Sequence, residues 1–301
     1  MVPIVRPAKA DRQVVAPGPE SCALHCADPV ARINDAVDRL DWSCLRRVLA
    51  VPGNPGYRLC RATEADFETY VASEDQAFKS RYLALNDGFL FIVEIPSPLH
   101  SAIADAVNDL MKLATGTMVT HLESSGDAYV DTSHLPEDQR LSRLEPDGSF
   151  GPTDASGAIL PATLTCWGEY QTIKVEVGVC EGWNHMDRKV LRYAAFTGIQ
   201  YVLCIYVSPA TASTAFMAVR QYKLCSFVHN VLEGPPPAAV APIPITADTE
   251  VELDARRLLA LPPHVRIPDG FNNTVVLRLN DALRRTWRSG NPDRTQVAAP
   301  F

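Results

Sequence analysis

An apolar run with two charges inside it, from Lys174 to Val179, limits the possible folds of this chain more than any other segment. Side chains alternate along a strand, so Lys174, Glu176 and Gly178 share one face and the valines share the other. A carboxylate in a buried strand costs several kcal/mol unless a partner or a metal ion compensates its charge. We therefore expect Glu176 to have an ion-pair partner or a functional role.

The residues around this run predict a strand–helix–strand unit. Two apolar strands, Ile173 to Cys180 and Tyr201 to Val207, flank a segment from Asn184 to Phe196 that has helical periodicity. A helical crossover of this length joins parallel, neighbouring strands. The chain is therefore predicted to be an α/β (α+β) protein with a central mixed sheet flanked by helices.

Composition favours a globular chain without a membrane span. The 301 residues can hold one large domain or two small ones, and 47% hydrophobic with 21% charged residues is an ordinary globular balance. No window approaches about 18 consecutive apolar residues, and the N-terminus has no secretory signal core. The eight cysteines form no C-x-x-C pair, which favours a reduced, intracellular protein of the cytoplasm or nucleus.

Five segments are expected along the chain. Residues 1–27 are proline-rich and predicted to be disordered, and residues 28–56 are predicted to form a helical lead-in. Residues 57–232 form the predicted core. Residues 233–247 are a proline-rich connector, and residues 248–301 add late strands, a short helix and a loose tail.

Local signals place several elements of the core. Thr63 is a plausible helix N-cap, and Phe89 to Ile95 is an apolar strand. Ser97 leads into a long helix. The segment from Ile159 to Cys166 is predicted to be a short strand, at a sheet edge because it contains Pro161.

Three charged residues near the opening run have the chemistry of phosphodiester hydrolysis. Asp147 precedes Glu176 in the chain, and Lys189 lies on the helix that follows it. Two carboxylates can bind Mg²⁺ or Mn²⁺, which activates water, and a lysine can stabilise the developing charge. Each residue also has an ordinary interpretation: Asp147 in a turn, Glu176 paired with Lys174 or an arginine, and Lys189 on a solvated helix face.

The order of these motifs resembles the PD-(D/E)XK nucleases, which have a restriction-endonuclease-like fold. More narrowly, it resembles the Uma-type endonucleases and their fungal and oomycete relatives. The resemblance covers residues 57–232, and its motifs are Pro96-Ser97-Pro98-Leu99-His100, Pro146-Asp147, Val175-Glu176-Val177, and Lys189 followed by Tyr193 and Gly198. It implies a restriction-endonuclease-like core and a Mg²⁺- or Mn²⁺-dependent hydrolase that cuts DNA, with RNA as the alternative. In such a site Asp147 and Glu176 are the metal ligands, and a homodimer is one expected assembly.

Two positions depart from the family pattern. Gly178 stands where the signature lysine would be, so Lys189 on the next helix, or Lys174 on the same strand face, is expected to take its place. The first helix also lacks the glutamate that related nucleases often carry. Asp105 and Glu94 are the nearest acids.

Three functions are compatible with these observations. The first is a metal-dependent endonuclease. The second is a catalytically inactive relative that serves as a binding or scaffold module, which Gly178 and the net charge of −7 favour because nucleic-acid binding normally uses a basic surface. The third is a self-associating protein held by the strands after Phe216. For His100, capping or packing explains the sequence as well as catalysis does, whereas Tyr193 is expected to face the sheet, where a tyrosine is more often a core residue than a site residue.

Overall fold

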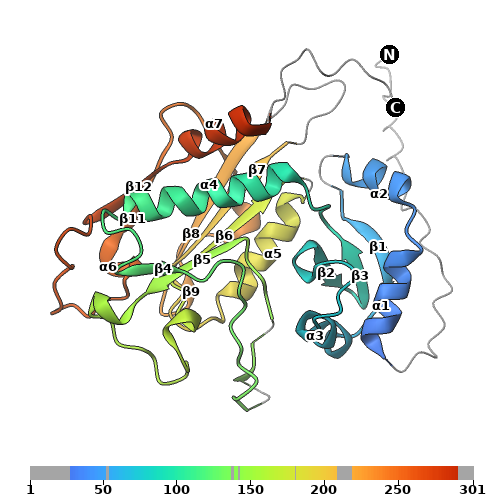
Figure 1. Ribbon diagram of the computed structural model, residues 1–301, viewed down its shortest axis with the longest axis horizontal. Coiled ribbons are helices and arrows are strands. Elements are labelled where there is room, and N and C mark those ends of the chain that lie inside the picture. Colours follow the sequence, from blue (N-terminus) through green and yellow to red (C-terminus); the bar gives the residue numbers. More distant parts are fainter. Residues whose placement is uncertain are drawn as a thin grey trace, which may run out of the picture.

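The computed structural model describes residues 28–51, 54–136, 139–141, 143–179, 181–208 and 219–290. A central mixed sheet flanked by helices confirms the α/β class (Figure 1). The segment 1–27, predicted to be disordered, and the tail after Gly290 lie outside the described residues. None of the described helices is long and apolar enough to cross a membrane.

The central sheet has the order β10-β8-β7-β6-β5-β4, and β9 pairs with β8. The predicted parallel pair is confirmed: β6 and β7 run parallel, with Glu176 beside Cys204, and the other neighbours in the sheet are antiparallel. The strands are β4 (Leu122–Ser124), β5 (Gly148–Pro152), β6 (Ile173–Gly178), β7 (Tyr201–Val207), β8 (Arg220–Val228), β9 (Val231–Leu232) and β10 (Ile243–Pro244).

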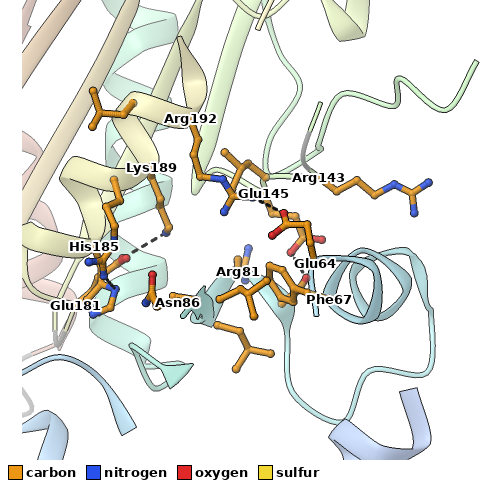
Figure 2. Close-up of a pocket in the computed structure, with 17 residues that line it drawn as sticks. Glu64, Phe67, Arg81, Asn86, Arg143, Glu145, Glu181, His185, Lys189 and Arg192 are labelled. Carbon is orange, nitrogen blue, oxygen red and sulfur yellow. Dashed lines mark hydrogen bonds and ion pairs between the residues drawn. The ribbon is translucent and has the colours of Figure 1, made fainter. Parts of the chain in front are cut away.

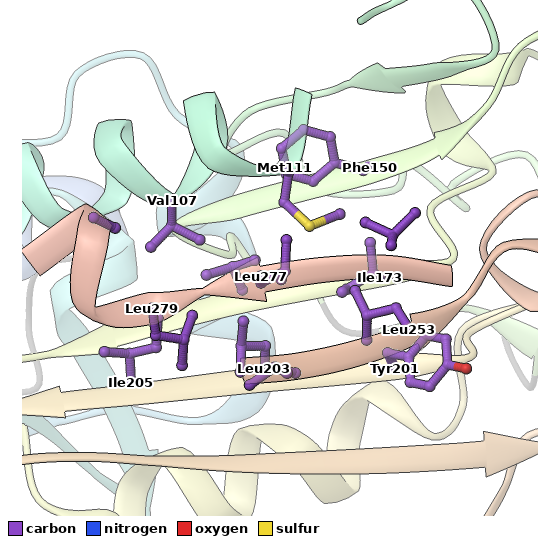
Figure 3. Close-up of a cluster of buried hydrophobic side chains, with 14 of the residues drawn as sticks. Val107, Met111, Phe150, Ile173, Tyr201, Leu203, Ile205, Leu253, Leu277 and Leu279 are labelled. Atoms are coloured by element: carbon purple, nitrogen blue, oxygen red, sulfur yellow. The ribbon is translucent and has the colours of Figure 1, made fainter. Parts of the chain in front are cut away.

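One face of the sheet is covered by a long helix and by the C-terminal part of the chain. The valines of β6 pack on this face, where Val107 and Met111 of the helix meet Leu277 of the C-terminal hairpin (Figure 3). The covering elements are α4 (Pro98–Ala114), β11 (Glu250–Asp254), α6 (Ala255–Leu258), β12 (Thr274–Arg278) and α7 (Leu279–Gly290). Residues from the late segment thus share one apolar core with the sheet.

The opposite face of the sheet packs against α5 (Trp183–Tyr193). Met186, Val190 and Tyr193 of this helix meet Val202 of β7 in a second core. Strand alternation directs the side chains of Lys174 and Glu176 toward α5, because the valines between them face the other core. The shared face predicted from sequence is therefore confirmed.

A separate N-terminal unit lies beside the sheet, on the side of α5 (Figure 1). Its small sheet has the order β1-β3-β2, and its helices bury an apolar core of their own. The elements are α1 (Pro29–Asp38), α2 (Trp42–Leu49), β1 (Tyr57–Arg61), α3 (Glu64–Ala72), β2 (Leu83–Asn86) and β3 (Phe89–Ile92). This unit forms one wall of the candidate site described below.

The helix starts predicted at Thr63 and Ser97 are confirmed. Thr63 caps α3 in a reciprocal capping box with Asp66, and the Ser97 hydroxyl caps α4. The predicted strand from Ile159 to Cys166 is wrong, because Pro161 begins a turn that Leu164 closes by donating its N–H to the Pro161 carbonyl. The predicted helical lead-in over residues 28–56 contains two helices, since the Asp41 side chain caps a second one, α2.

Candidate functional site

Four buried carboxylates gather where β6 ends, between α4, α5 and the N-terminal unit. Lys189 pairs with two of them, and the charge of one, Asp147, contributes to raising the pKa of the other three. We call this group the acidic cluster, and its members are Glu94, Asp147, Glu176 and Glu181. The structure thus brings Asp147, Glu176 and Lys189, three of the candidate residues named from the sequence, into one region.

Glu176 is fully buried, and both of its oxygens accept hydrogen bonds from α5. The Lys189 ammonium lies 2.8 Å from Oε2, and the Tyr193 hydroxyl donates to Oε1 at 2.5 Å. Burial raises the pKa of Glu176 to about 7, although the Lys189 charge opposes the rise. Tyr193, for which packing was one expectation, therefore both fills the core and holds Glu176.

Asp147 stands just before β5 and reaches across to β6. Its Oδ2 accepts the Val177 N–H at 2.7 Å, and its Oδ1 lies 3.2 Å from Nε2 of His100 at the start of α4. Burial alone would raise the pKa of Asp147, but the bond and charge of His100, together with Lys189, hold it below its usual value. Burial likewise opposes protonation of His100, yet Asp147 raises the His100 pKa to about 9. At neutral pH the two therefore form an ion pair.

Glu94 and Glu181 complete the cluster, and sequence reasoning did not assign them. Glu94 follows β3, is 1% exposed and accepts the Val179 N–H at 3.2 Å. Burial raises its pKa to about 8. In the sequence, Glu94 is an acid at the end of an apolar strand, and this pattern alone did not assign it to a site. Glu181 follows β6 in a loop, where no local pattern marks it.

The two candidate lysines have different surroundings. Lys189 bonds Glu176 and also lies 3.4 Å from Glu181. Lys174 instead donates to Gln171, and its ammonium lies over the rings of Tyr193 and Phe196. The ion pairs found among the described residues join Glu176 to Lys189 and not to Lys174. Burial lowers the pKa of Lys174 to about 7.

The surroundings of Gly178 leave no room for a side chain at this position of β6. A Cβ atom at this position would stand 2.9 Å from the Glu181 carbonyl and 3.1 Å from Cε of Met186. The backbone that returns from β6 to α5 passes too close for a side chain. Lys189 supplies its ammonium group to the same carboxylate from the helix instead.

A cavity of about 370 Å³ adjoins the cluster, between α5 and the N-terminal unit (Figure 2). Glu181 of the cluster and its ion-pair partner Lys189 both line the cavity. Five cationic side chains and three carboxylates line it, although the chain as a whole carries a net charge of −7. The cations are Arg81, Arg143, Arg188, Lys189 and Arg192. The cavity is thus a locally basic region at the edge of an acidic cluster.

In the described part of the chain, no three His, Cys, Asp or Glu side chains already stand where they could hold a metal ion. The oxygens of Asp147 and Glu176 accept bonds from protein donors instead. The donor set still has the chemistry of a hard-cation site, because it consists of carboxylate oxygens. One oxygen of Glu181, Oε1, is buried without a partner among the described residues.

Comparisons with protein-family models, with curated proteins and with solved structures found no match to this chain.

Proposed function

We propose that the chain is a metal-dependent endonuclease that hydrolyses phosphodiester bonds of DNA, with a restriction-endonuclease-like core. The observation that carries the proposal is the meeting of Asp147, Glu176 and Lys189, which come from three separate segments, in one buried site beside a basic cavity. Perturbed acids and bases that converge beside a cavity are typical of catalytic sites. Nucleic acid is the proposed partner, in the cytoplasm or nucleus, with RNA as the second candidate polymer.

Charge and donor chemistry support a divalent cation in the acidic cluster. Four buried carboxylates face mainly two cations, Lys189 and His100, and burial raises the pKa of three of them, Glu94, Glu176 and Glu181. A Mg²⁺ or Mn²⁺ ion would relieve this repulsion through oxygen coordination. Asp147 and Glu176 would hold the ion, and Glu181 offers a free oxygen.

The residues that contact Asp147 and Glu176 have separate tasks in the proposed reaction. A bound divalent ion supplies Lewis-acid activation of the phosphate and a more acidic water. The Lys189 ammonium, already 2.8 Å from Glu176, would stabilise negative charge that develops on the phosphate oxygens. His100 orients Asp147 through its bond to Oδ1, and Tyr193 orients Glu176 through its bond to Oε1.

A second function, an inactive nuclease-fold module that binds a partner, is favoured by one specific observation. Asp147 and Glu176 are already satisfied by His100, Lys189, Tyr193 and a backbone N–H, as in a site whose cations replace the metal. In that case the cluster is a structural ion-pair network, and the basic cavity is its remaining functional feature.

Cleavage of supercoiled plasmid DNA distinguishes the two functions. With Mg²⁺ or Mn²⁺, the wild-type chain is expected to nick the plasmid, and Glu176→Gln and Lys189→Met are each expected to lower the rate at least about a hundredfold. Lys174→Met is expected to retain activity, because Lys174 donates to Gln171, and the ion pair found for Glu176 in the described part of the chain is with Lys189. Glu252→Gln, at an exposed position on β11, is the matched control and should match wild type.

Two outcomes contradict the proposal. A purified wild-type chain that cuts neither DNA nor RNA with either ion supports the inactive module. Full cleavage by Glu176→Gln would show that the activity does not come from this site.

A further inference from the structure

We infer that the cavity between α5 and the N-terminal unit binds a single nucleotide, through its phosphate and a neighbouring hydroxyl or N–H group. The inference rests on the proposed function and deepens it. It specifies a substrate whose strand end or unpaired nucleotide enters the cavity beside the acidic cluster.

The charges of the cavity fit a phosphate group. Arg81 from the N-terminal unit and Arg192 from α5 extend toward the middle of the cavity from opposite sides, whereas Arg143 turns its guanidinium outward (Figure 2). Lys189 and the exposed Arg188 add two further cations from α5. Arginine forks are suited to phosphate because they bind two of its oxygens at once.

Arg81 connects the cavity with the cluster. Burial lowers the pKa of Arg81, but the nearby Tyr82 hydroxyl and the Asp147 carboxylate raise it above its ordinary value. The Arg81 guanidinium therefore interacts electrostatically with Asp147, a proposed metal ligand. A phosphate bound by Arg81 would be held next to the catalytic carboxylates.

Two buried polar atoms in this wall have no partner within the described ranges. They are Nε of Arg81, a donor, and Oε1 of Glu181, an acceptor, and the Glu181 side chain is only 3% exposed. Unpaired buried atoms of this kind are costly and mark places where a ligand can bind. A nucleotide supplies the matching pair: phosphate oxygens that accept, and a sugar hydroxyl or base N–H that donates.

Two of the cavity arginines pair with largely exposed carboxylates. Arg81 lies 2.7 Å from Asp127, whose side chain is 64% exposed. Arg192 lies 3.5 Å from Glu64, whose side chain is 62% exposed, so opening this pair costs little. The cavity volume, about 370 Å³, is that of a small-ligand site and accommodates one nucleotide rather than a double helix. Apolar side chains that include Phe67 and Leu83 form the remaining wall, against which a base can pack.

Titration calorimetry with thymidine 5′-monophosphate, in a metal-chelating buffer, tests the inference without any cleavage. We expect saturable binding by the full chain and at least about tenfold weaker binding by the Arg188→Gln/Arg192→Gln double variant. Neither of these two arginines is buried. Arg81→Gln should have a similar effect. Arg278→Gln removes an exposed arginine that does not line the cavity, and it should bind as wild type does.

The controls separate this inference from the proposed function. Thymidine without phosphate is expected not to bind. Inorganic phosphate that binds as tightly as the nucleotide, or arginine variants that bind normally, would overturn the inference. Nucleotide binding without plasmid cleavage would retain the inference and reject the nuclease, whereas cleavage without nucleotide binding would do the reverse.

Discussion

A residue of the acidic cluster could be predicted from the sequence where a charged side chain interrupts an apolar run that is expected to be buried. Glu176 could be identified because a carboxylate within a run of valines requires compensation. Glu94 carries the same signal more weakly, at the end of its strand. Glu181 and Arg81 could not be found this way, because one lies in a loop and the other in a distant unit, and only the fold places them at one cavity.

Lys174 gives a prediction at this scale. Its pKa is lowered by burial to about 7, so the folded chain releases a proton that the unfolded chain keeps up to its ordinary pKa of 10.5. Stability therefore rises with pH between these values, and the cost of the buried charge is fully present below about pH 7. The contacts of the ammonium with the Tyr193 and Phe196 rings favour the charged form and reduce this cost without changing its sign.

The variant Lys174→Met removes the titrating group. Its gain in unfolding free energy over wild type, measured by chemical denaturation, is expected to be larger at about pH 6 than at about pH 9, by roughly 3 kcal/mol. Groups that do not interact with Lys174 titrate in both proteins and cancel in the comparison. An equal gain at the two pH values would show that Lys174 keeps its charge in the folded state.

At the scale of elements, the tight connection from β6 to α5 leaves no room for a side chain at Gly178. The ammonium group next to Glu176 is therefore supplied by Lys189 of α5. The strand, the helix and β7 were predictable because apolar runs, helical periodicity and the closing glycine are local signals. Strand β1 was not, since Arg58 and Arg61 break its apolar pattern. The structure places both guanidinium groups over the Phe89 ring of β3, a cross-strand contact that no local pattern reveals.

A methyl group at Gly178 tests this connection. Gly178→Ala is expected to lower the unfolding free energy by about 1–3 kcal/mol, because its Cβ would meet the Glu181 carbonyl and Met186. Thermal denaturation measures the loss. Gly168→Ala is the matched control, since a Cβ there meets only Sγ of Cys166 at 3.9 Å. If both variants lose the same stability, the close backbone passage is not what excludes a side chain.

At the scale of the whole molecule, the candidate site depends on parts that are far apart in the chain. The N-terminal unit supplies Glu94 and Arg81, the segment before β5 supplies Asp147, and α5 supplies Lys189. The sequence predicted the α/β class and the order of the motifs. It did not predict the cavity, which exists only because the small sheet packs beside α5.

Calorimetric titration of the full chain with Mn²⁺ tests the central claim, that the acidic cluster is a metal site, most directly. At about pH 8 we expect saturable binding that disappears in Asp147→Asn and Glu176→Gln and persists in the exposed control Glu252→Gln. The affinity should fall as the pH is lowered, because the pKa values of Glu94 and Glu176, raised to about 8 and about 7, leave protons that the ion must displace. Absence of binding at every pH, or equal binding by Glu176→Gln, would contradict the account.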